Sequence, residues 1–347
     1  MSEVTNIQEA IQQLVCGQHL TLAQTEAIFT DIMTGNTTDA QIASFVTAMR
    51  MKGETIDEIT ACAKVMRAQC AKIFPREDVM DIVGTGGDNA NLFNVSTLAS
   101  IVVAAAGVRV AKHGNRSVSS KCGSADVLEA LGVNIMLTPE QSEKMLYDVG
   151  ICFLFAPLYH ASMKYAAPVR KQLGVRTLFN MLGPLSNPAA ATMCLIGVYD
   201  DSLAAPFANV LKNLGVKRAM VVCGHDGLDE VSLCTSTTVC EVNGDAINSF
   251  FLNPAQLGLS LCRPEELVGG DPAVNADIAM SILRGKPGPQ KDMVVLNASL
   301  CLYMDNQNMT LRECVNRARE IIDSGKALAK LEEMVTYSRQ FAGEDLT

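Results

Sequence analysis

The chain has 347 residues, enough to bury one large hydrophobic core or a large and a small one. Its composition, 48% hydrophobic and 19% charged, excludes an intrinsically disordered protein. The net charge of −9 argues against nucleic acid or an anionic membrane surface as the main partner.

The first seventy residues predict a small helical domain, with bounds 1–73. Three segments match the capping-box pattern, in which Ser or Thr precedes Glu or Gln by three places: Thr21–Gln24, Thr38–Gln41 and Thr55–Glu58. After the second box, apolar residues recur at the spacing of one helix face, at Ile42, Phe45, Val46 and Met49. Gly53 is placed to end that helix. We expect these helices to pack rather than to carry chemistry.

From KIFPRED onward, short apolar runs alternate with helical stretches, and Gly, Asn and Pro flank the runs. The runs are DVMDIV, VRVAK, GICFLF, CLIGVY and RAMVVC. This alternation predicts an α/β fold, with a larger domain over residues 74–347 and a central, mostly parallel sheet. Residues 164–190 include a further helical stretch, which we expect to pack on the first domain. Ligands of such sheets bind beyond the carboxyl ends of the strands, where the polar loops lie.

The stretch MDIVGTGGDNANLFNVST, residues 80–97, predicts a strand, a glycine-rich loop and a helix start. A dinucleotide fingerprint needs glycine where Asn89 stands, and a Walker A loop needs glycine and lysine where Asn89 and Ala90 stand. Both motifs are excluded. A tight turn without a ligand and a phosphate-binding loop both remain open. Asn94, Ser96 and Thr97 could equally cap the helix or help to cradle a phosphate.

The next polar loop, VRVAKHGNRSVSSKCGSAD, reverses the sign of the chain's net charge locally. It holds four basic residues and no acidic residue between its first arginine and its second lysine: Arg109, Lys112, Arg116 and Lys121. Further hydrogen-bond donors are His113, Asn115, Ser117, Ser119, Ser120 and Ser124. A solvated basic loop is the alternative, but this density of small and hydroxyl residues favours an anion site. Two such loops after successive strands predict a ligand with more than one phosphate.

Two later segments carry charged residues that such a ligand site could use. The loop DGLDEVS follows the run RAMVVC and contains Asp229 and Glu230. Mg²⁺ usually accompanies a polyphosphate, held by one or two carboxylates and phosphate oxygens, and Asp88 is a second candidate ligand. An acidic pair on the surface is the alternative. Residues 156–188 contain Lys164, Arg170, Lys171 and Arg176, with His160 and Tyr165 among them. An arginine there could pair with a substrate carboxylate or be a surface charge.

Cysteine usage and the N-terminal sequence indicate where the protein works. The twelve cysteines form no Cys-x-x-Cys pair and do not cluster with the four histidines. Most lie in apolar runs, as do Cys152 and Cys223, where cysteine packs as a small hydrophobic residue. We therefore expect free thiols and a cytoplasmic protein. The start MSEVTNIQEA has no signal-peptide character, and the longest apolar run is too short to span a bilayer, so we expect no membrane partner.

Five stretches together resemble the anthranilate phosphoribosyltransferase family: GTGGD, NVST, KHGNRSVSSKCGSADVLEALG, the block from APLYH to PVRKQLGVRTLFNMLGPL, and GLDEVS. They occur in the family's order and spacing, and the likeness covers nearly the whole chain. The resemblance implies the nucleoside phosphorylase/phosphoribosyltransferase type of fold, with a small helical domain through which two copies form a homodimer. It implies no nucleic-acid partner.

The resemblance also implies the reaction, a step of tryptophan biosynthesis. The phosphoribosyl group of 5-phosphoribosyl 1-diphosphate (PRPP) is transferred to the amine of anthranilate. The implied PRPP contacts are Gly84, Gly87, Asp88, Asn94, Val95, Ser96, Thr97, Lys112, His113, Gly114, Asn115, Arg116, Ser117, Val118, Ser119, Ser120 and Ser124. The implied anthranilate contacts are Gly84, Asn115 and Arg170, with His113 and His160 nearby, and the Mg²⁺-linked positions are Ser96, Asp229 and Glu230. An aromatic amine has a free lone pair, so we assign no catalytic base, although His113 remains an option.

Two positions depart from the family's pattern. Leu92 stands where Thr or Ser is common, and Cys122 stands where serine is common. Loss of a hydroxyl beside the donor is expected to weaken its binding by about 1 kcal/mol. Two alternative functions are a pyrimidine nucleoside phosphorylase-like enzyme and an inactive homologue that binds nucleic acid. The phosphorylase family has Lys-His-Ser leading into its glycines, where this chain has Ile82, Val83, Gly84 and Thr85. The net charge and the Asp229–Glu230 pair oppose the nucleic-acid-binding alternative.

Overall fold

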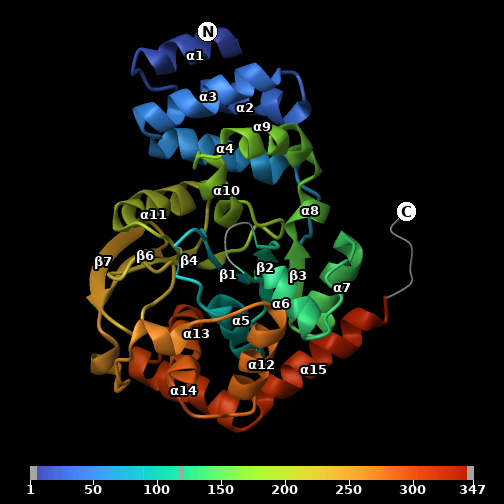
Figure 1. The fold of residues 1–347 in the computed structure, drawn as a ribbon, viewed down its shortest axis with the longest axis vertical. Coiled ribbons are helices and arrows are strands. Elements are labelled where there is room, and N and C mark those ends of the chain that lie inside the picture. The colour runs from blue at the N-terminus through green and yellow to red at the C-terminus, as the bar shows by residue number, and fades with distance from the viewer. Residues whose placement is uncertain (1–5, 89, 118–120, 342–347) are drawn as a thin grey trace.

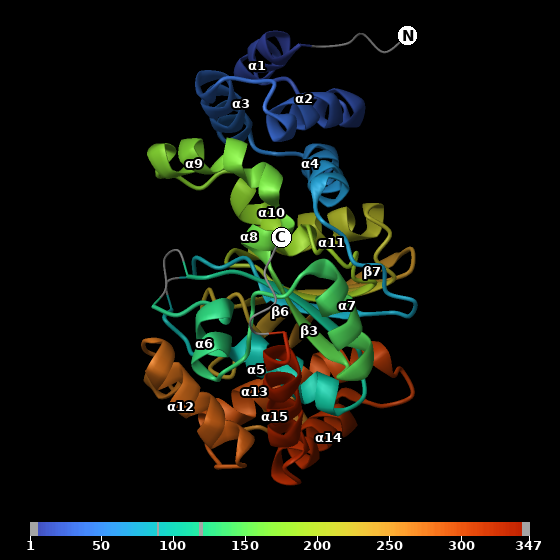
Figure 2. The ribbon, with the colours of Figure 1, turned by 90° about the vertical axis from the view of Figure 1, so that its right-hand side faces the viewer.

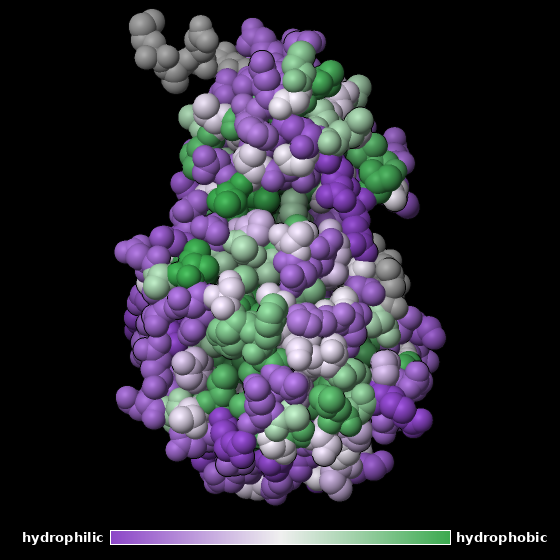
Figure 3. All heavy atoms as spheres, turned by 90° about the vertical axis from the view of Figure 1, so that its left-hand side faces the viewer, coloured by the Kyte–Doolittle hydropathy of each residue, from purple (hydrophilic) through white to green (hydrophobic). Residues whose placement is uncertain are grey.

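The structure, a computed structural model, describes residues 6–88, 90–117 and 121–341. Figure 1 shows a small helical lobe stacked on a larger α/β lobe. The space-filling view in Figure 3 shows the same two-part outline, with hydrophobic and hydrophilic residues interspersed on that face. None of the helices in the described ranges has both the length and the apolar character that a bilayer-spanning helix needs. All twelve cysteines are free thiols.

The helical lobe begins with α1 (Ile7–Val15), α2 (Leu22–Thr34), α3 (Asp39–Lys52) and α4 (Ile56–Gln69). The three predicted capping boxes form at Thr21, Thr38 and Thr55, each of which accepts a hydrogen bond from the amide three residues on. The predicted apolar face of α3 is buried. That helix ends at Gly53, whose φ of 88° favours glycine. Local sequence signals therefore account for these helices.

A second helical segment returns from the large lobe and joins the small one. It consists of α8 (Ala156–Tyr159), the 3-10 helix η1 (Ala161–Tyr165), α9 (Ala167–Leu173) and α10 (Phe179–Leu185). Helix η1 contacts α2, α9 contacts α3 and α10 contacts α4. The rings of Phe29, on α2, and Phe179, on α10, also lie 5.6 Å apart. Helices from two distant parts of the sequence thus share one hydrophobic core.

The large lobe is built on a seven-stranded sheet with the order β3-β2-β1-β4-β5-β6-β7. Its strands are β1 (Met80–Gly84), β2 (Val110–Gly114), β3 (Ile151–Phe155), β4 (Met193–Gly197), β5 (Arg218–Gly224), β6 (Thr237–Asn243) and β7 (Ala246–Leu252). The first five run parallel, and β6 and β7 are antiparallel, so the expected mostly parallel sheet is confirmed. The order reverses between β1 and β4, and ligands of such sheets bind at this switch point.

Helices cover both faces of the sheet. They are α5 (Val95–Ala105), α6 (Ser124–Ala130), α7 (Pro139–Asp148), α11 (Ala204–Asn213), α12 (Pro272–Leu283), α13 (Pro289–Asp305), α14 (Leu311–Asp323) and α15 (Lys326–Arg339), with the 3-10 helices η2 (Asp201–Leu203), η3 (Pro254–Leu257) and η4 (Pro264–Leu267). Figure 2 shows α5 and α12 to α15 on the side of the sheet away from the helical lobe. Helix α5 contacts β1, β2, α13, α14 and α15, which explains why its sequence is mostly apolar.

Candidate active site

The loops that follow β1, β4 and β5 meet at the switch point of the sheet. Gly84 ends β1 and pairs in register with Gly197, which ends β4. Asp229, from the loop after β5, lies over both glycines. A Cβ atom on Gly84 would overlap the Asp229 carboxylate, and one on Gly197 would overlap its backbone carbonyl. Glycine is therefore required at both strand ends so that the acidic loop can cover them.

Asp229 holds the glycine loop in place. Its Oδ2 atom accepts a hydrogen bond of 2.6 Å from the backbone N–H of Gly86. Gly86 and Gly87 have φ values of 70° and 83°, which other residues rarely adopt. The sequence left open whether these glycines form only a tight turn. The structure shows a turn that is tied to a carboxylate from a distant part of the chain.

Glu230 faces the start of α5 beside a buried lysine. Its Oε1 atom accepts a 3.2 Å hydrogen bond from the backbone N–H of Ser96, in the first turn of that helix. Lys112 is 3% exposed, and its Nζ atom lies 3.3 Å from Ser96 Oγ and donates to the carbonyl of Ile82. The sequence-predicted residues Gly84, Ser96, Lys112, Asp229 and Glu230 are thus brought together.

The carboxyl groups of this cluster repel one another. Burial, followed by the nearby Asp88 carboxylate, raises the pKa of Asp229 to about 7. Burial, followed by the charge of Asp229, raises the pKa of Glu230 well above its usual range, and Lys112 opposes this shift. A bound divalent cation would offset this repulsion, because hard cations bind carboxylate oxygens. The donor set therefore fits Mg²⁺.

The cluster is not a complete metal cage. Among residues 6–88, 90–117 and 121–341, no three His, Cys, Asp or Glu side chains are arranged to hold a metal ion together. Mg²⁺ commonly takes only one or two protein carboxylates and completes its shell with water and phosphate oxygens. A shared site for Mg²⁺ and a phosphate ligand is therefore consistent with this geometry.

The polar residues at the start of α5 have different neighbours. Asn94 makes no helix-capping bond with its side chain; it donates to the carbonyl of Cys122 at 3.1 Å and accepts from Asn275 at 2.9 Å. Val95 and Thr97 are buried. Asn94 is the N-cap residue of α5, but its side chain does not cap the helix amides.

The loop after β2 is tied to α6. A Cβ atom on Gly114 would clash with Ser124, and Ser124 Oγ donates to the carbonyl of Asn115 at 3.3 Å. Arg116 is exposed and forms ion pairs with Asp126 and Glu129. The backbone N–H of Ser117 also donates to the Asp126 carboxylate, at 3.0 Å. The predicted site residues Val118, Ser119 and Ser120 lie outside the described residues.

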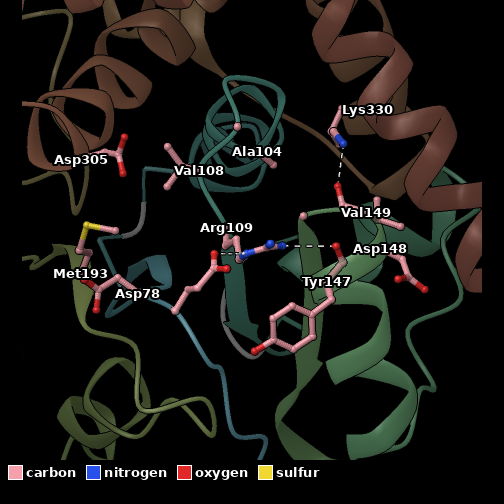
Figure 4. A pocket seen from close by; sticks show the side chains of 13 residues that line it. Asp78, Ala104, Val108, Arg109, Tyr147, Asp148, Val149, Met193, Asp305 and Lys330 are labelled. Atoms are coloured by element: carbon pink, nitrogen blue, oxygen red, sulfur yellow. Dashed lines mark hydrogen bonds and ion pairs between the residues drawn. The ribbon is translucent and has the colours of Figure 1, made fainter.

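Arg109, which the sequence grouped with this basic loop, lies at the opposite end of β2, and that grouping is wrong. It lines a cavity of about 440 Å³ at the amino ends of the strands (Figure 4). Arg109 is paired there with Glu77 at 2.8 Å and donates to the carbonyls of Leu146 and Tyr147. Lys330 donates to the carbonyl of Val149. Both cations of this cavity already have partners within the protein.

Two histidine rings lie side by side, one from β2 and one from the residue after α8. The rings of His113 and His160 are 5.0 Å apart, and each residue is 5% exposed. Burial, followed by the neighbouring His160, lowers the pKa of His113 to about 3, and burial lowers that of His160 to about 4. Both rings are therefore neutral at pH 7. Arg170 packs over the ring of Phe179 at 5.4 Å, and burial lowers the pKa of its guanidinium.

Several residues that support the site were not singled out as site residues from sequence. Asn275 accepts from the N–H of Gly270 at 2.7 Å and donates to Asn94. Asn297, on α13, bonds both the N–H and the carbonyl of Val231 and so fixes the acidic loop. Asp81, on β1, accepts from the backbone N–H of His113 at 3.1 Å. A charged residue inside the apolar run DVMDIV was the available signal for Asp81; the two asparagines gave none.

The two departures from the family's pattern lie next to the site. Cys122 is buried, and its thiol contacts Asn94 Oδ1 at 3.4 Å. Burial raises the pKa of that thiol to about 11, so it is protonated at pH 7. Leu92 forms an isolated antiparallel bridge with Val268. Cys122 therefore contacts the residue that precedes α5, and Leu92 pairs with the residue that follows η4.

Comparisons with known proteins agree with this architecture. Residues 8–70 match the model of the glycosyl transferase family helical bundle domain, and residues 76–328 match that of the glycosyl transferase family a/b domain. The chain is 64% identical to the anthranilate phosphoribosyltransferase of Ruminiclostridium cellulolyticum over 97% of this chain and 99% of that protein. It is 51% identical to that of Methanobrevibacter smithii over 96% of this chain and 99% of that protein.

Solved structures give the same result. The crystal structure of anthranilate phosphoribosyltransferase from Thermus thermophilus superposes with a TM-score of 0.90 at 41% identity, covering 95% of this chain and 99% of that one. The Saccharomyces cerevisiae enzyme in complex with PRPP and Mg superposes with a TM-score of 0.89 at 29% identity, covering 96% and 98%. The expected fold class is confirmed. The chain belongs to the anthranilate phosphoribosyltransferase family.

Proposed function

We propose that the protein transfers the phosphoribosyl group of PRPP to the amine of anthranilate, which yields N-(5-phosphoribosyl)anthranilate and diphosphate in tryptophan biosynthesis. The observation that carries this proposal is the cluster at the switch point, where Asp229 covers the ends of β1 and β4 and Glu230 faces the start of α5. The similar proteins are named anthranilate phosphoribosyltransferases, and the structure of the yeast enzyme contains PRPP and Mg.

The donor is assigned to the glycine loop, the start of α5 and the loop after β2. Backbone amides at a helix start favour phosphate. Burial lowers the pKa of Lys112, and the charges of Asp81 and Glu230 oppose this shift. The residues assigned to PRPP are those that the family resemblance implies: Gly84, Gly87, Asp88, Asn94, Val95, Ser96, Thr97, Lys112, His113, Gly114, Asn115, Arg116, Ser117, Val118, Ser119, Ser120 and Ser124.

The chemical step breaks the bond between C1 of the ribose and the diphosphate. Positive charge then develops on the ribose, and negative charge develops on the leaving group. Asp229, Glu230 and Ser96 are assigned to Mg²⁺, which when bound neutralises charge on the diphosphate. Lys112 and the amides at the start of α5 favour the same charge from fixed positions, so little reorganisation is needed.

Anthranilate is assigned to the region around His113 and His160, with contacts to Gly84, Asn115 and Arg170. A guanidinium group binds a carboxylate through a planar fork, and Arg170 is held over Phe179. The buried neutral rings of His113 and His160 suit an aromatic amine. The lone pair of that amine needs no base before attack, so positioning supplies much of the rate. We assign no catalytic base.

The experiment that tests this function follows anthranilate fluorescence. Purified protein is mixed with PRPP, Mg²⁺ and anthranilate, and each component is omitted in turn. A fall in fluorescence that needs all three components supports the transferase. No fall with a folded protein overturns it; phosphorolysis of pyrimidine nucleosides and binding of nucleic acid would then be measured.

The domain bounds and the assembly are also proposals. The model of the helical domain ends at residue 70 and that of the a/b domain begins at residue 76, which supports a boundary between residues 73 and 74.

Exposed apolar side chains at Val15 and Met51, 68% and 84% exposed, support a homodimer through the helical lobe. Free cysteines support a cytoplasmic location. Light scattering during gel filtration tests the dimer, and a monomeric mass would contradict it.

A further inference from the structure

Arg176 connects the returning helical segment to the glycine loop. It lies between α9 and α10, in the part of the chain that packs on the helical lobe. Its guanidinium donates a hydrogen bond to the backbone carbonyl of Gly87. The same group lies over the ring of Tyr199, with its Cζ atom 4.1 Å from the ring centroid. Tyr199 follows β4 by two residues, so three separate parts of the chain meet at this side chain.

The glycine loop is consequently held from two sides by opposite charges. The Asp229 carboxylate accepts from the N–H of Gly86, and the Arg176 guanidinium donates to the carbonyl of Gly87. Gly86 and Gly87 both have left-handed φ values, and because glycine lacks a Cβ atom their backbone could also adopt other conformations. The peptide bond after Gly87 is planar and trans, so its carbonyl and the N–H of Asp88 point in opposite directions. By fixing the carbonyl, Arg176 also fixes the direction of that amide.

A side chain at position 87 would have to displace the Arg176 guanidinium. A Cβ atom on Gly87 would lie 2.8 Å from the Arg176 Nη2 atom. Stacking on Tyr199 restricts the guanidinium plane, and a fork that is already oriented loses little entropy when it donates. Arg176 is therefore a preorganised support of the loop and not a freely rotating surface charge.

We propose that Arg176 is a positioning residue for the phosphoribosyl donor: it sets the orientation of the peptide between Gly87 and Asp88 and couples the loop to the helical lobe. This inference rests on the proposed function. It assigns to Arg176 no contact with either substrate. Its effect on the donor passes through the backbone of the glycine loop.

The test compares R176A, R176K, Y199F and Y199A with the wild-type protein. R176A is expected to raise the KM for PRPP by about tenfold, with a change below about twofold in the KM for anthranilate, since only the donor loop is released. R176K is expected to recover part of the loss, because it keeps a donor for the carbonyl but not the stacked plane. Y199F is expected to match the wild type, and Y199A to fall between the wild type and R176A.

The control is K171A, which removes one exposed positive charge from the adjacent helix α9. It is expected to leave both KM values unchanged, which separates a positioned contact from a general loss of charge. Hydrogen–deuterium exchange without substrates gives a second measurement: R176A should speed exchange at residues 84–88 and not in the core of β1. Equal KM values for PRPP in R176A and wild type, or unchanged exchange in the loop, would overturn the proposal.

Failure of the proposed function gives a different pattern. If the wild-type protein consumes no anthranilate, the transferase activity is wrong, yet the exchange comparison still decides whether Arg176 holds the loop. If the wild type is active and R176A loses activity through kcat alone, with an unchanged KM for PRPP, the positioning role for the donor is wrong while the function stands.

Discussion

The helical lobe and the strand-end site both bury charged groups, but they treat them differently. In the helical lobe, Lys52 and Glu58 have side chains 3% and 0% exposed and form an ion pair at 2.8 Å. Glu58 also accepts from the N–H groups of Leu20 and Thr55. At the site, burial and then neighbouring carboxylates raise the pKa values of Asp229 and Glu230. Fully paired buried groups support folding, whereas the repelling carboxylates are held in place for a ligand.

The largest effect that separates the two regions is expected for Asp229→Asn. This change should lower kcat/KM by about 100-fold or more, because it removes a negative oxygen ligand from the proposed Mg²⁺ site. The melting temperature should stay equal or rise, because an uncompensated buried charge disappears. Activity assays and thermal unfolding measure the two effects. Asp245→Asn, at a fully exposed carboxylate, is the matched control. A marked loss of stability without a loss of activity would mean that Asp229 supports folding rather than ligand binding.

Glu58→Gln is expected to show the opposite behaviour. It leaves Lys52 buried without its counter-charge, which should cost about 3 kcal/mol of unfolding free energy. The kcat of the folded protein should change little, since the pair lies in the helical lobe. Denaturant unfolding measures the loss, and Lys52→Met in the same background should restore part of it. A stable E58Q variant would mean that the ion pair contributes nothing to folding.

The histidines near the site and the Lys52–Glu58 pair of the helical lobe should affect stability in different pH ranges. His113 and His160 have folded pKa values of about 3 and about 4, below the unfolded value of about 6.5. The unfolded chain therefore binds protons first as the pH falls, and each histidine should lower the unfolding free energy by about 2 kcal/mol at pH 5. His160→Gln should remove part of this slope between pH 6.5 and 4. An unchanged slope would show that the ring is not buried in solution.

Glu58 titrates in a different window. Burial opposes ionisation, but the Lys52 hydrogen bond and the two backbone donors outweigh it and lower the pKa of Glu58. A group with a depressed folded pKa contributes stability above its unfolded value of about 4.3 and loses it as the pH falls further. The contribution of the Lys52–Glu58 pair to the unfolding free energy should therefore change mainly at lower pH than the contribution of the histidines.

The two regions also differ in how far the sequence predicts them. The helices around Thr21, Thr38 and Thr55 could be predicted, because a capping box and an apolar stripe are local signals. The meeting of Gly84 with Asp229 could not be derived from spacing, since 145 positions separate them and strand order decides their contact. The family resemblance named both residues, but only the fold explains why Gly197 must also lack a side chain.

Arg176 and Arg109 show the same limit for charged residues. The sequence offered both as basic residues in polar segments. The first lies on the glycine loop, and the second pairs with Glu77 at the far end of the sheet. A formal charge in a loop says nothing about which end of a strand it occupies or whether a carboxylate already neutralises it. Partners of this kind come from tertiary packing, which a single sequence does not display.

The smallest effect is expected for Thr38→Ala, which breaks one capping box in the helical lobe. The Thr38 hydroxyl accepts from the N–H of Gln41 at 3.3 Å, and the Gln41 side chain accepts from the N–H of Thr38 at 2.9 Å. Loss of the first contact should lower the unfolding free energy by about 1 kcal/mol. Activity should be unchanged, because the α3 start lies outside the site. Thr38→Ser keeps the cap and is the control. A loss of activity in T38A alone would show that the lobes are coupled more tightly than the Arg176 contact implies.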